Sequence, residues 1–142
     1  MPTKIDHIGI AVHSIEEARG FYEALGLHVE EIEEVESEGV RVAMLPLGES
    51  RIELLEPTRG DSPIATFLEK RGPGMHHVCF GTADIEGDDT KLRAEGVRVL
   101  RPEPTVGAGG SRVQFVHPKD AGGVLVELSE PPASGNGQES GG

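Results

Sequence analysis

The chain has 142 residues, with 13 lysines and arginines against 25 aspartates and glutamates, and a formal net charge of −12. This charge argues against a nucleic-acid partner, because binding a phosphate backbone needs clustered basic side chains. The single cysteine, Cys79, leaves no disulfide framework and favours a reducing, cytoplasmic setting. No run of 18 apolar residues occurs and the first strand is expected almost at Met1, so we expect neither a membrane span nor a signal peptide.

The apolar pattern predicts one domain over residues 1–130 that uses the same succession of elements twice. In the first half we expect a helix at 14–26, capped by Ser14, and strands at 4–12, 28–34, 39–46 and 50–56. A short helix at 62–70 lies in the linker. In the second half we expect a helix at 84–96, capped by Asp84, and strands at 75–82, 97–101, 112–117 and 123–129. The polar tail, 131–142, is expected to be disordered.

The two halves match in residues as well as in order. "DHIGIAV" aligns with "HHVCFGT", which superposes His7 on His77, and "RIELLEP" aligns with "LVELSEP", which superposes Glu53 on Glu127. A βαβββ module (about 4–56 and 75–129) cannot bury its sheet alone, so the two copies should pack around a shared concavity. This packing would bring the two histidines and two glutamates to facing, equivalent places.

Each of these residues also has a structural interpretation. A lone histidine that opens a strand is more often structural than a ligand, and one buried glutamate could pair with an arginine. Two glutamates inside apolar strands are harder to explain, because an unpaired buried carboxylate is costly. Two imidazoles and two carboxylates together offer mixed N/O ligation to a divalent cation. The sequence therefore predicts a metal site formed by His7, Glu53, His77 and Glu127.

The doublet in "GMHHVCF" must be divided, because successive strand residues point to opposite faces. His77 aligns with His7 and is the expected ligand, whereas His76 should point away from the metal and serve packing or hydrogen bonding. Cys79 shares the face of His77, but a packed core thiol is its expected role. Lys119, in "HPKDAGG", is either a surface charge or a contact for an anionic group of the substrate.

Four stretches, "DHIGIAV", "RIELLEPTRGDSPIATFLEK", "GMHHVCFGTADI" and "HPKDAGGVLVEL", resemble the methylmalonyl-CoA epimerase family of the vicinal oxygen chelate superfamily, over about residues 4 to 130. The resemblance implies an α+β fold in which two βαβββ modules form an open, cup-shaped, eight-stranded barrel. It also implies a homodimer, an acyl-CoA thioester substrate, and a divalent ion, Co²⁺ in the first place with Ni²⁺, Mn²⁺ or Zn²⁺ as alternatives. The family's metal ligands fall on the same four residues, His7, Glu53, His77 and Glu127.

The resemblance further implies epimerisation of (2R)- and (2S)-methylmalonyl-CoA by α-proton abstraction and reprotonation through a metal-stabilised enolate. Several relatives place a catalytic glutamate three residues after the glycine of a "GV" strand, and the matching position here is Val42. We therefore expect Glu127 to act as one base and Glu53, its repeat equivalent, as the other.

Three alternatives use related sites. A glyoxalase I-type lactoylglutathione lyase shares the ligand set, although "DSPIA" and "HPKD" speak against it. An extradiol dioxygenase would use two histidines and one carboxylate, so a fourth ligand at Glu53 argues against it. Some relatives only sequester drugs without a metal, and four intact ligands disfavour that function.

Overall fold

The computed structural model of the protein describes residues 1–133, so most of the expected tail lies outside the described residues. The first module contains β1 (Pro2–Ala11), α1 (Ile15–Ala24), β2 (Glu31–Val35), β3 (Val40–Leu47) and β4 (Ser50–Pro57), and α2 (Pro63–Arg71) follows it. The second module contains β5 (Gly74–Thr82), α3 (Ile85–Ala94), β6 (Thr105–Val106), β7 (Arg112–Val116) and β8 (Val126–Glu130). Single 3₁₀ turns occur at Glu36–Glu38, Ala108–Gly110 and Pro118–Asp120.

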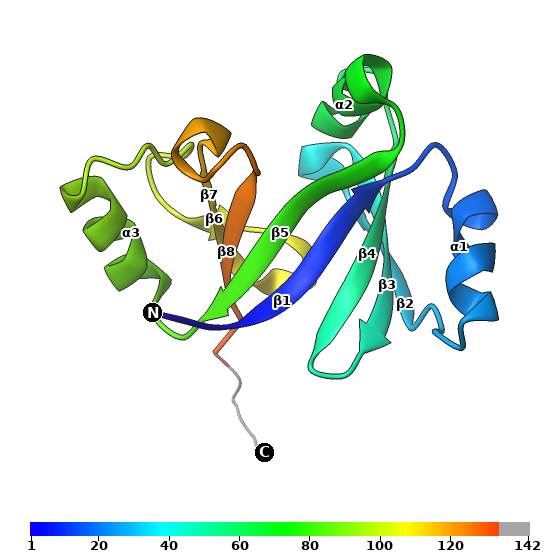
Figure 1. The fold of residues 1–142 in the computed structure, drawn as a ribbon, viewed down its shortest axis with the longest axis horizontal. Coiled ribbons are helices and arrows are strands. Elements are labelled where there is room, and N and C mark those ends of the chain that lie inside the picture. Colours follow the sequence, from blue (N-terminus) through cyan, green and yellow to red (C-terminus); the bar gives the residue numbers. More distant parts are fainter. Residues whose placement is uncertain (134–142) are drawn as a thin grey trace.

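The strands of residues 1–133 form one eight-stranded sheet with the order β2-β3-β4-β1-β5-β8-β7-β6. Read inward from one edge, the order is β2-β3-β4-β1, and read inward from the other edge it is β6-β7-β8-β5. These are the equivalent strands of the two modules, so the sheet is symmetric about the β1–β5 pair. Within each module the first and last strands are parallel, β1 with β4 and β5 with β8, and the antiparallel pair β1–β5 joins the modules. The sheet curls into an open cup, with α1 and α3 on its two outer sides (Figure 1). The α+β fold of two βαβββ modules is confirmed.

The helix caps repeat as well. Ser14 accepts a hydrogen bond from Glu17 N at 3.2 Å, and Asp84 accepts one from Gly87 N at 3.0 Å, as the sequence predicts. The first helical N–H of α1, on Ile15, donates to the Glu56 carboxylate at 2.8 Å. The equivalent N–H of α3, on Ile85, donates to Glu130 at 2.9 Å. The duplication therefore extends from strand order to individual hydrogen bonds.

Two apolar clusters lie on opposite faces of the first module's strands. One gathers on the side of α1 and consists of Val12, Ile15, Ala43, Leu45 and Leu54. The other gathers on the side of α2 and consists of Ala11, Val40, Val42, Met44, Leu55, Ile64 and Leu68. The second cluster forms part of the wall of the cup, so the core of this module also shapes the concavity.

The prediction of a strand at 97–101 is wrong. Only Val99 forms a bridge there, to Val116, and the second strand of this module is the two-residue β6. The peptide of Arg101 bonds instead to the side chain of Gln114, whose Oε1 accepts from Arg101 N at 3.2 Å and whose Nε2 donates to Arg101 O at 3.0 Å. Since Pro102 and Pro104 follow closely and have no N–H, the segment cannot continue as a ladder.

Two other boundaries also shift. The strand expected at 28–34 begins at Glu31, and the one expected at 123–129 begins at Val126. In the second case, Gly122 and Gly123 have φ values of 73° and 90°, which prolongs the preceding turn into the predicted strand.

Candidate metal and acid–base site

Strand register places the four predicted site residues in two equivalent pairs. In β1–β4 the glutamate at 53 lies opposite Gly9, two residues after His7. In β5–β8 the glutamate at 127 lies opposite Cys79, two residues after His77. All four predicted side chains are buried, with at most 8% of each residue exposed. The repeat alignment therefore gives the correct relative positions of the two modules' polar residues.

Three of the four side chains converge on one point. Nε2 of His7 lies 3.0 Å from Nε2 of His77 and 3.2 Å from Oε1 of Glu127, and Nε2 of His77 lies 3.0 Å from the same oxygen. Ligands about 2.1 Å from an octahedral ion are separated by about 3.0 Å when they are neighbours in its coordination shell. The three atoms thus match one face of such a shell, and this geometry fits a divalent cation.

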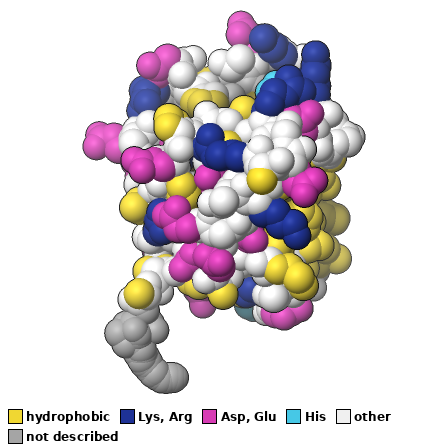
Figure 2. Space-filling model, turned by 90° about the vertical axis from the view of Figure 1, so that its left-hand side faces the viewer, with side chains coloured by type: hydrophobic (Ala, Val, Ile, Leu, Met, Phe, Trp, Pro, Cys, Tyr) yellow, Lys and Arg dark blue, Asp and Glu magenta, His cyan; other side chains and the backbone are white. Residues whose placement is uncertain are grey.

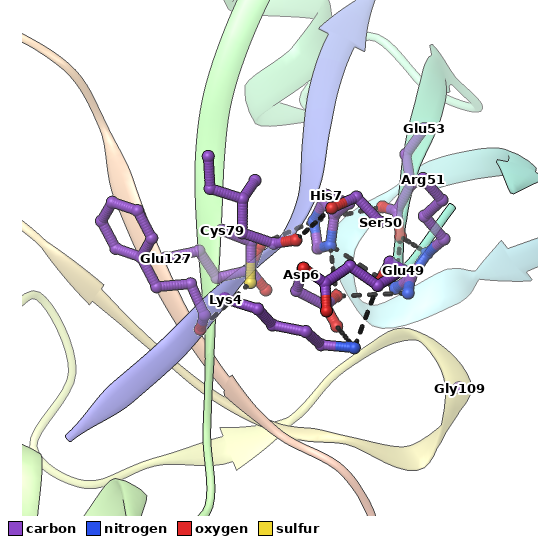
Figure 3. A network of polar contacts seen from close by, with 12 residues as sticks. Lys4, Asp6, His7, Glu49, Ser50, Arg51, Glu53, Cys79, Gly109 and Glu127 are labelled. Carbon is purple, nitrogen blue, oxygen red and sulfur yellow. Dashed lines mark hydrogen bonds and ion pairs between the residues drawn. The ribbon is translucent and has the colours of Figure 1, made fainter. Parts of the chain in front are cut away.

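Glu53 stands beside this trio. Its Oε1 lies 3.4 Å from Nε2 of His7, but the carboxylate is not part of the group whose ligand atoms all lie within 4.8 Å of one another. Arg51, two residues earlier on β4, donates from Nε to Oε2 of Glu53 at 2.7 Å. Arg51 also reaches Asp6 at 3.2 Å, and Figure 3 shows these residues as one network around His7. Oε1 of Glu53 thus remains free of the arginine and directed toward His7.

The residue before each histidine holds that imidazole by its other nitrogen. Oδ2 of Asp6 lies 2.8 Å from Nδ1 of His7, and Nδ1 of His76 lies 3.0 Å from Nδ1 of His77. Burial, together with the charge of His77, lowers the pKa of His76 to about 4. His76 is therefore neutral, and its Nδ1 can accept a hydrogen bond from Nδ1 of His77. Both predicted ligand histidines can therefore carry their proton on Nδ1, which leaves the Nε2 lone pair for a metal. Asp6 and His76 are equivalent in the repeat.

The electrostatics of the site favour a positive charge at its centre. Burial alone would lower the pKa of His7, but hydrogen bonding with Asp6, Cys79 and Glu127 and the charge of Glu53 raise it to about 12. Burial would raise the pKa of Glu127, but His7 and His77 lower it to about 2. Since metal ligation needs a neutral imidazole, a divalent ion would take the place of the proton on His7. The donor set therefore fits such an ion in charge as well as in geometry.

Gly9 makes room for the second histidine. It lies opposite His77 in the β1–β5 pairing, and a Cβ at Gly9 would stand 2.3 Å from Cε1 of His77. The ring can therefore cross β1 only because residue 9 has no side chain. A glycine inside a strand indicates such a close approach, and that signal is present in "DHIGIAV".

The site opens into a cavity of about 290 Å³ inside the cup. Glu53, His77 and Glu127 line it, together with Val42, Leu55, Ile64, Val113, Phe115 and Leu125. Val42 is 2% exposed and belongs to this apolar wall, so the position that carries a glutamate in several relatives offers no acid or base here. The cavity is thus mostly apolar with acidic groups at one end.

The remaining sequence candidates lie elsewhere. Lys119 is exposed and lines neither this cavity nor a neighbouring one of about 300 Å³, which borders His76 and Leu125. Cys79 is completely buried, and burial raises the pKa of its thiol to about 12, as expected of a core thiol. On the face shown in Figure 2, acidic and basic side chains are interspersed over most of the surface. Among the described residues, the helices are too short and too polar to span a bilayer.

Four residues around the site were missed by sequence reasoning: Asp6, Gly9, Arg51 and Arg101. For two of them the sequence carries a signal: Asp6 aligns with His76 in the repeat, and Gly9 is a glycine inside a predicted strand. Arg51 shares the strand parity of Glu53, which was a weaker indication. The trio by itself is also the two-histidine, one-carboxylate set of iron(II) oxygenases, so the ligands alone do not decide the reaction.

Comparison with known proteins narrows the choice of protein family. Residues 6–115 match the model of the Glyoxalase/Bleomycin resistance protein/Dioxygenase superfamily. Human mitochondrial methylmalonyl-CoA epimerase is 43% identical over 129 residues, which span 89% of this chain and 73% of the relative. A Streptomyces coelicolor methylmalonyl-CoA epimerase variant in complex with 2-nitronate-propionyl-CoA is 48% identical with a TM-score of 0.90, covering 94% of this chain and 97% of that one. A methylmalonyl-CoA epimerase in complex with methylmalonyl-CoA and NH4+ gives the same identity, coverage and TM-score. The chain therefore belongs to the methylmalonyl-CoA epimerase family, within the Glyoxalase/Bleomycin resistance protein/Dioxygenase superfamily.

Proposed function

We propose that this enzyme interconverts (2R)- and (2S)-methylmalonyl-CoA by moving the proton on the α-carbon. The convergence of His7, His77 and Glu127 at 3.0–3.2 Å, in a chain so similar to epimerases over its whole domain, carries this proposal. The α-carbon lies between a thioester carbonyl and a carboxylate, so loss of its proton gives an enolate. Inversion then requires that a proton leave from one face and return to the other.

Glu127 and Glu53 are the proposed acid–base pair. Their Oε1 atoms lie 3.2 and 3.4 Å from Nε2 of His7, and both side chains line the cavity. One carboxylate takes the α-proton, and the other, protonated, returns a proton to the opposite face, after which their protonation states are exchanged. A divalent ion held by His7, His77 and Glu127, with Glu53 as the fourth ligand, would supply positive charge that stabilises the enolate oxygens.

Proton–deuterium exchange at the α-carbon tests this proposal. In D₂O, wild-type protein with Co²⁺ should exchange the α-proton and convert either epimer into the other, and chelation should stop both. A glutathione hemithioacetal, the substrate of a glyoxalase I-type lyase, should not react. Absence of metal-dependent exchange with methylmalonyl-CoA would overturn the proposed function.

Two variants test the roles of the carboxylates. Glu53→Gln should slow epimerisation by about 100- to 10,000-fold, the usual contribution of a positioned acid or base, while one epimer still exchanges its proton at Glu127. Glu34→Gln is the control, since Glu34 lies exposed on β2. Unchanged epimerisation by Glu53→Gln with metal retained would remove Glu53 from the mechanism.

The other properties that the resemblance implies are also part of the proposal. We propose Co²⁺ as the ion, ahead of Ni²⁺, Mn²⁺ or Zn²⁺, a homodimer, and a cytoplasmic location. The acyl-CoA thioester is supported by the relatives solved with CoA ligands. Lys119 stays a predicted contact for an anionic group of the substrate. Metal analysis and sedimentation of the purified protein test the first two points.

A further inference from the structure

Among the charged side chains of the mostly apolar cavity wall, three are glutamates and one is an arginine. Glu38, Glu53 and Glu127 line the cavity, and Arg101 is the single lysine or arginine that does so within residues 1–133. The proposed substrate carries a carboxylate and the phosphates of CoA, so three glutamates would repel it. A metal ion would offset this repulsion at the end of the cavity near His77, and another cation is needed where the rest of the substrate enters.

Arg101 lies one aromatic ring away from the candidate metal site. Its guanidinium carbon lies 4.8 Å from the centroid of the Phe115 ring, and the Phe115 and His77 rings are 6.4 Å apart between centroids. Phe115 pairs with Glu127 in the β7–β8 ladder. Arg101, Phe115 and His77 therefore follow one another along the same cavity wall. The guanidinium therefore stands within the span of a ligand that begins at the trio.

The main chain of Arg101 is held firmly in place. Gln114 is completely buried and binds both the N–H and the C=O of Arg101, and it also donates to Asp89 at 2.9 Å. Arg93 donates to the same carbonyl of Arg101 at 2.7 Å. This polar network, which is buried at Gln114 and Asp89 and interrupts the expected strand at 97–101, fixes where the Arg101 side chain starts.

The hydrogen-bond partners of the guanidinium are exchangeable. Nη2 of Arg101 donates to Oε2 of Glu38 at 3.0 Å, across the cup from the 3₁₀ turn after β2, and Nη1 donates to Thr105. The side chains of Arg101 and Glu38 are 23% and 39% exposed. Partly exposed ion pairs contribute little to stability, so an incoming anion can displace the glutamate.

We propose that Arg101 binds an anionic group of the substrate and that Glu38 occupies this position in the free protein as an internal competitor. The inference rests on the proposed function, because it takes methylmalonyl-CoA as the ligand. The anion is either the malonyl carboxylate or a CoA phosphate, which share the same charge-assisted, planar recognition by arginine. Arg101 is then a determinant of substrate affinity, and Glu38 acts on affinity with the opposite sign.

The test compares KM and kcat for wild type, Arg101→Gln, Glu38→Gln and the control Arg19→Gln, which removes the same charge from α1. Arg101→Gln should raise KM by about 10- to 100-fold, the range for a lost charge-assisted bond, with kcat changed less than about threefold. Glu38→Gln should lower KM by about two- to fivefold, and Arg19→Gln should change neither constant. Melting temperatures establish that all variants are folded.

A second substrate identifies the anion. With methylmalonyl-pantetheine, which has no phosphate, an undiminished effect of Arg101→Gln assigns the carboxylate and a lost effect assigns a phosphate. Wild-type KM in Arg101→Gln with both substrates overturns the inference. A raised KM in Glu38→Gln also overturns it, because the pair would then be a structural latch. Absence of exchange in wild type would instead refute the proposed function, so the two failures are distinguishable.

Discussion

Replacement of Gly9 by alanine tests the position of His77 without touching any ligand. The new methyl group would stand 2.3, 2.6 and 2.8 Å from Cε1, Nδ1 and Nε2 of His77. Carbon atoms in contact are normally about 3.5–4.0 Å apart, so the ring must retreat by about 1 Å or more. Metal–ligand distances tolerate only about 0.2 Å, so this movement should detach Nε2 of His77 from the ion. Overpacking should also cost about 1–3 kcal/mol of folding free energy.

Titration calorimetry with Co²⁺ measures the first effect and thermal unfolding the second. We expect Gly9→Ala to lose at least about 10- to 100-fold in Co²⁺ affinity, the loss produced even by disturbing an outer-shell partner. Gly74→Ala is the matched control, since Gly74 lies in β5 and a Cβ there would meet nothing within 4 Å. Wild-type Co²⁺ affinity in Gly9→Ala would refute His77 as a ligand, whatever happens to the melting temperature.

Three further predictions follow from the same contacts. His77→Ala should abolish Co²⁺ binding, whereas His76→Ala should keep full stoichiometry with about 10- to 100-fold weaker affinity; equal losses in calorimetry would mean that the doublet is wrongly divided. Arg51→Met should weaken Co²⁺ binding by a similar factor because Oε2 of Glu53 loses its donor at 2.7 Å, while Arg41→Met, on the outer side of the same β3–β4 pair, should not. Without metal, the raised pKa of His7 gives stability that is complete below about pH 6.5 and is lost as pH rises toward 12. The lowered pKa of Glu127 gives stability that is complete above about pH 4.5 and is lost toward pH 2. Added Co²⁺ should reduce the loss of stability at alkaline pH. The measurement is the melting temperature as a function of pH, in chelator and in Co²⁺, and parallel curves under the two conditions would contradict this expectation.

The fold and the placement of the four candidate site residues could be predicted from sequence because both come from the duplication. Aligning the halves superposes His7 on His77 and Glu53 on Glu127, and the parallel pairing of β1–β4 and β5–β8 preserves that alignment in space. The segment around Arg101 could not be predicted, because its peptide bonds to the side chain of Gln114 rather than to a neighbouring strand. When a side chain takes the place of a neighbouring strand as the hydrogen-bond partner of a peptide, the amino-acid sequence shows no periodic pattern. For the same reason, the cation that faces the cavity was not foreseen.

The two modules diverge at the positions that would handle the proton. Asp6, which holds His7, is replaced in the second module by neutral His76, which holds His77. Arg51, which engages one oxygen of Glu53, is replaced by Leu125, so within residues 1–133 no lysine or arginine pairs with Glu127, whose carboxylate contacts the two histidines. A symmetric ligand set would treat the two faces of a substrate carbon alike, and an acid–base pair needs one carboxylate protonated while the other is not. The duplication therefore explains the convergence of the proposed ligands, and the differences around them give the two carboxylates unequal surroundings within one cavity.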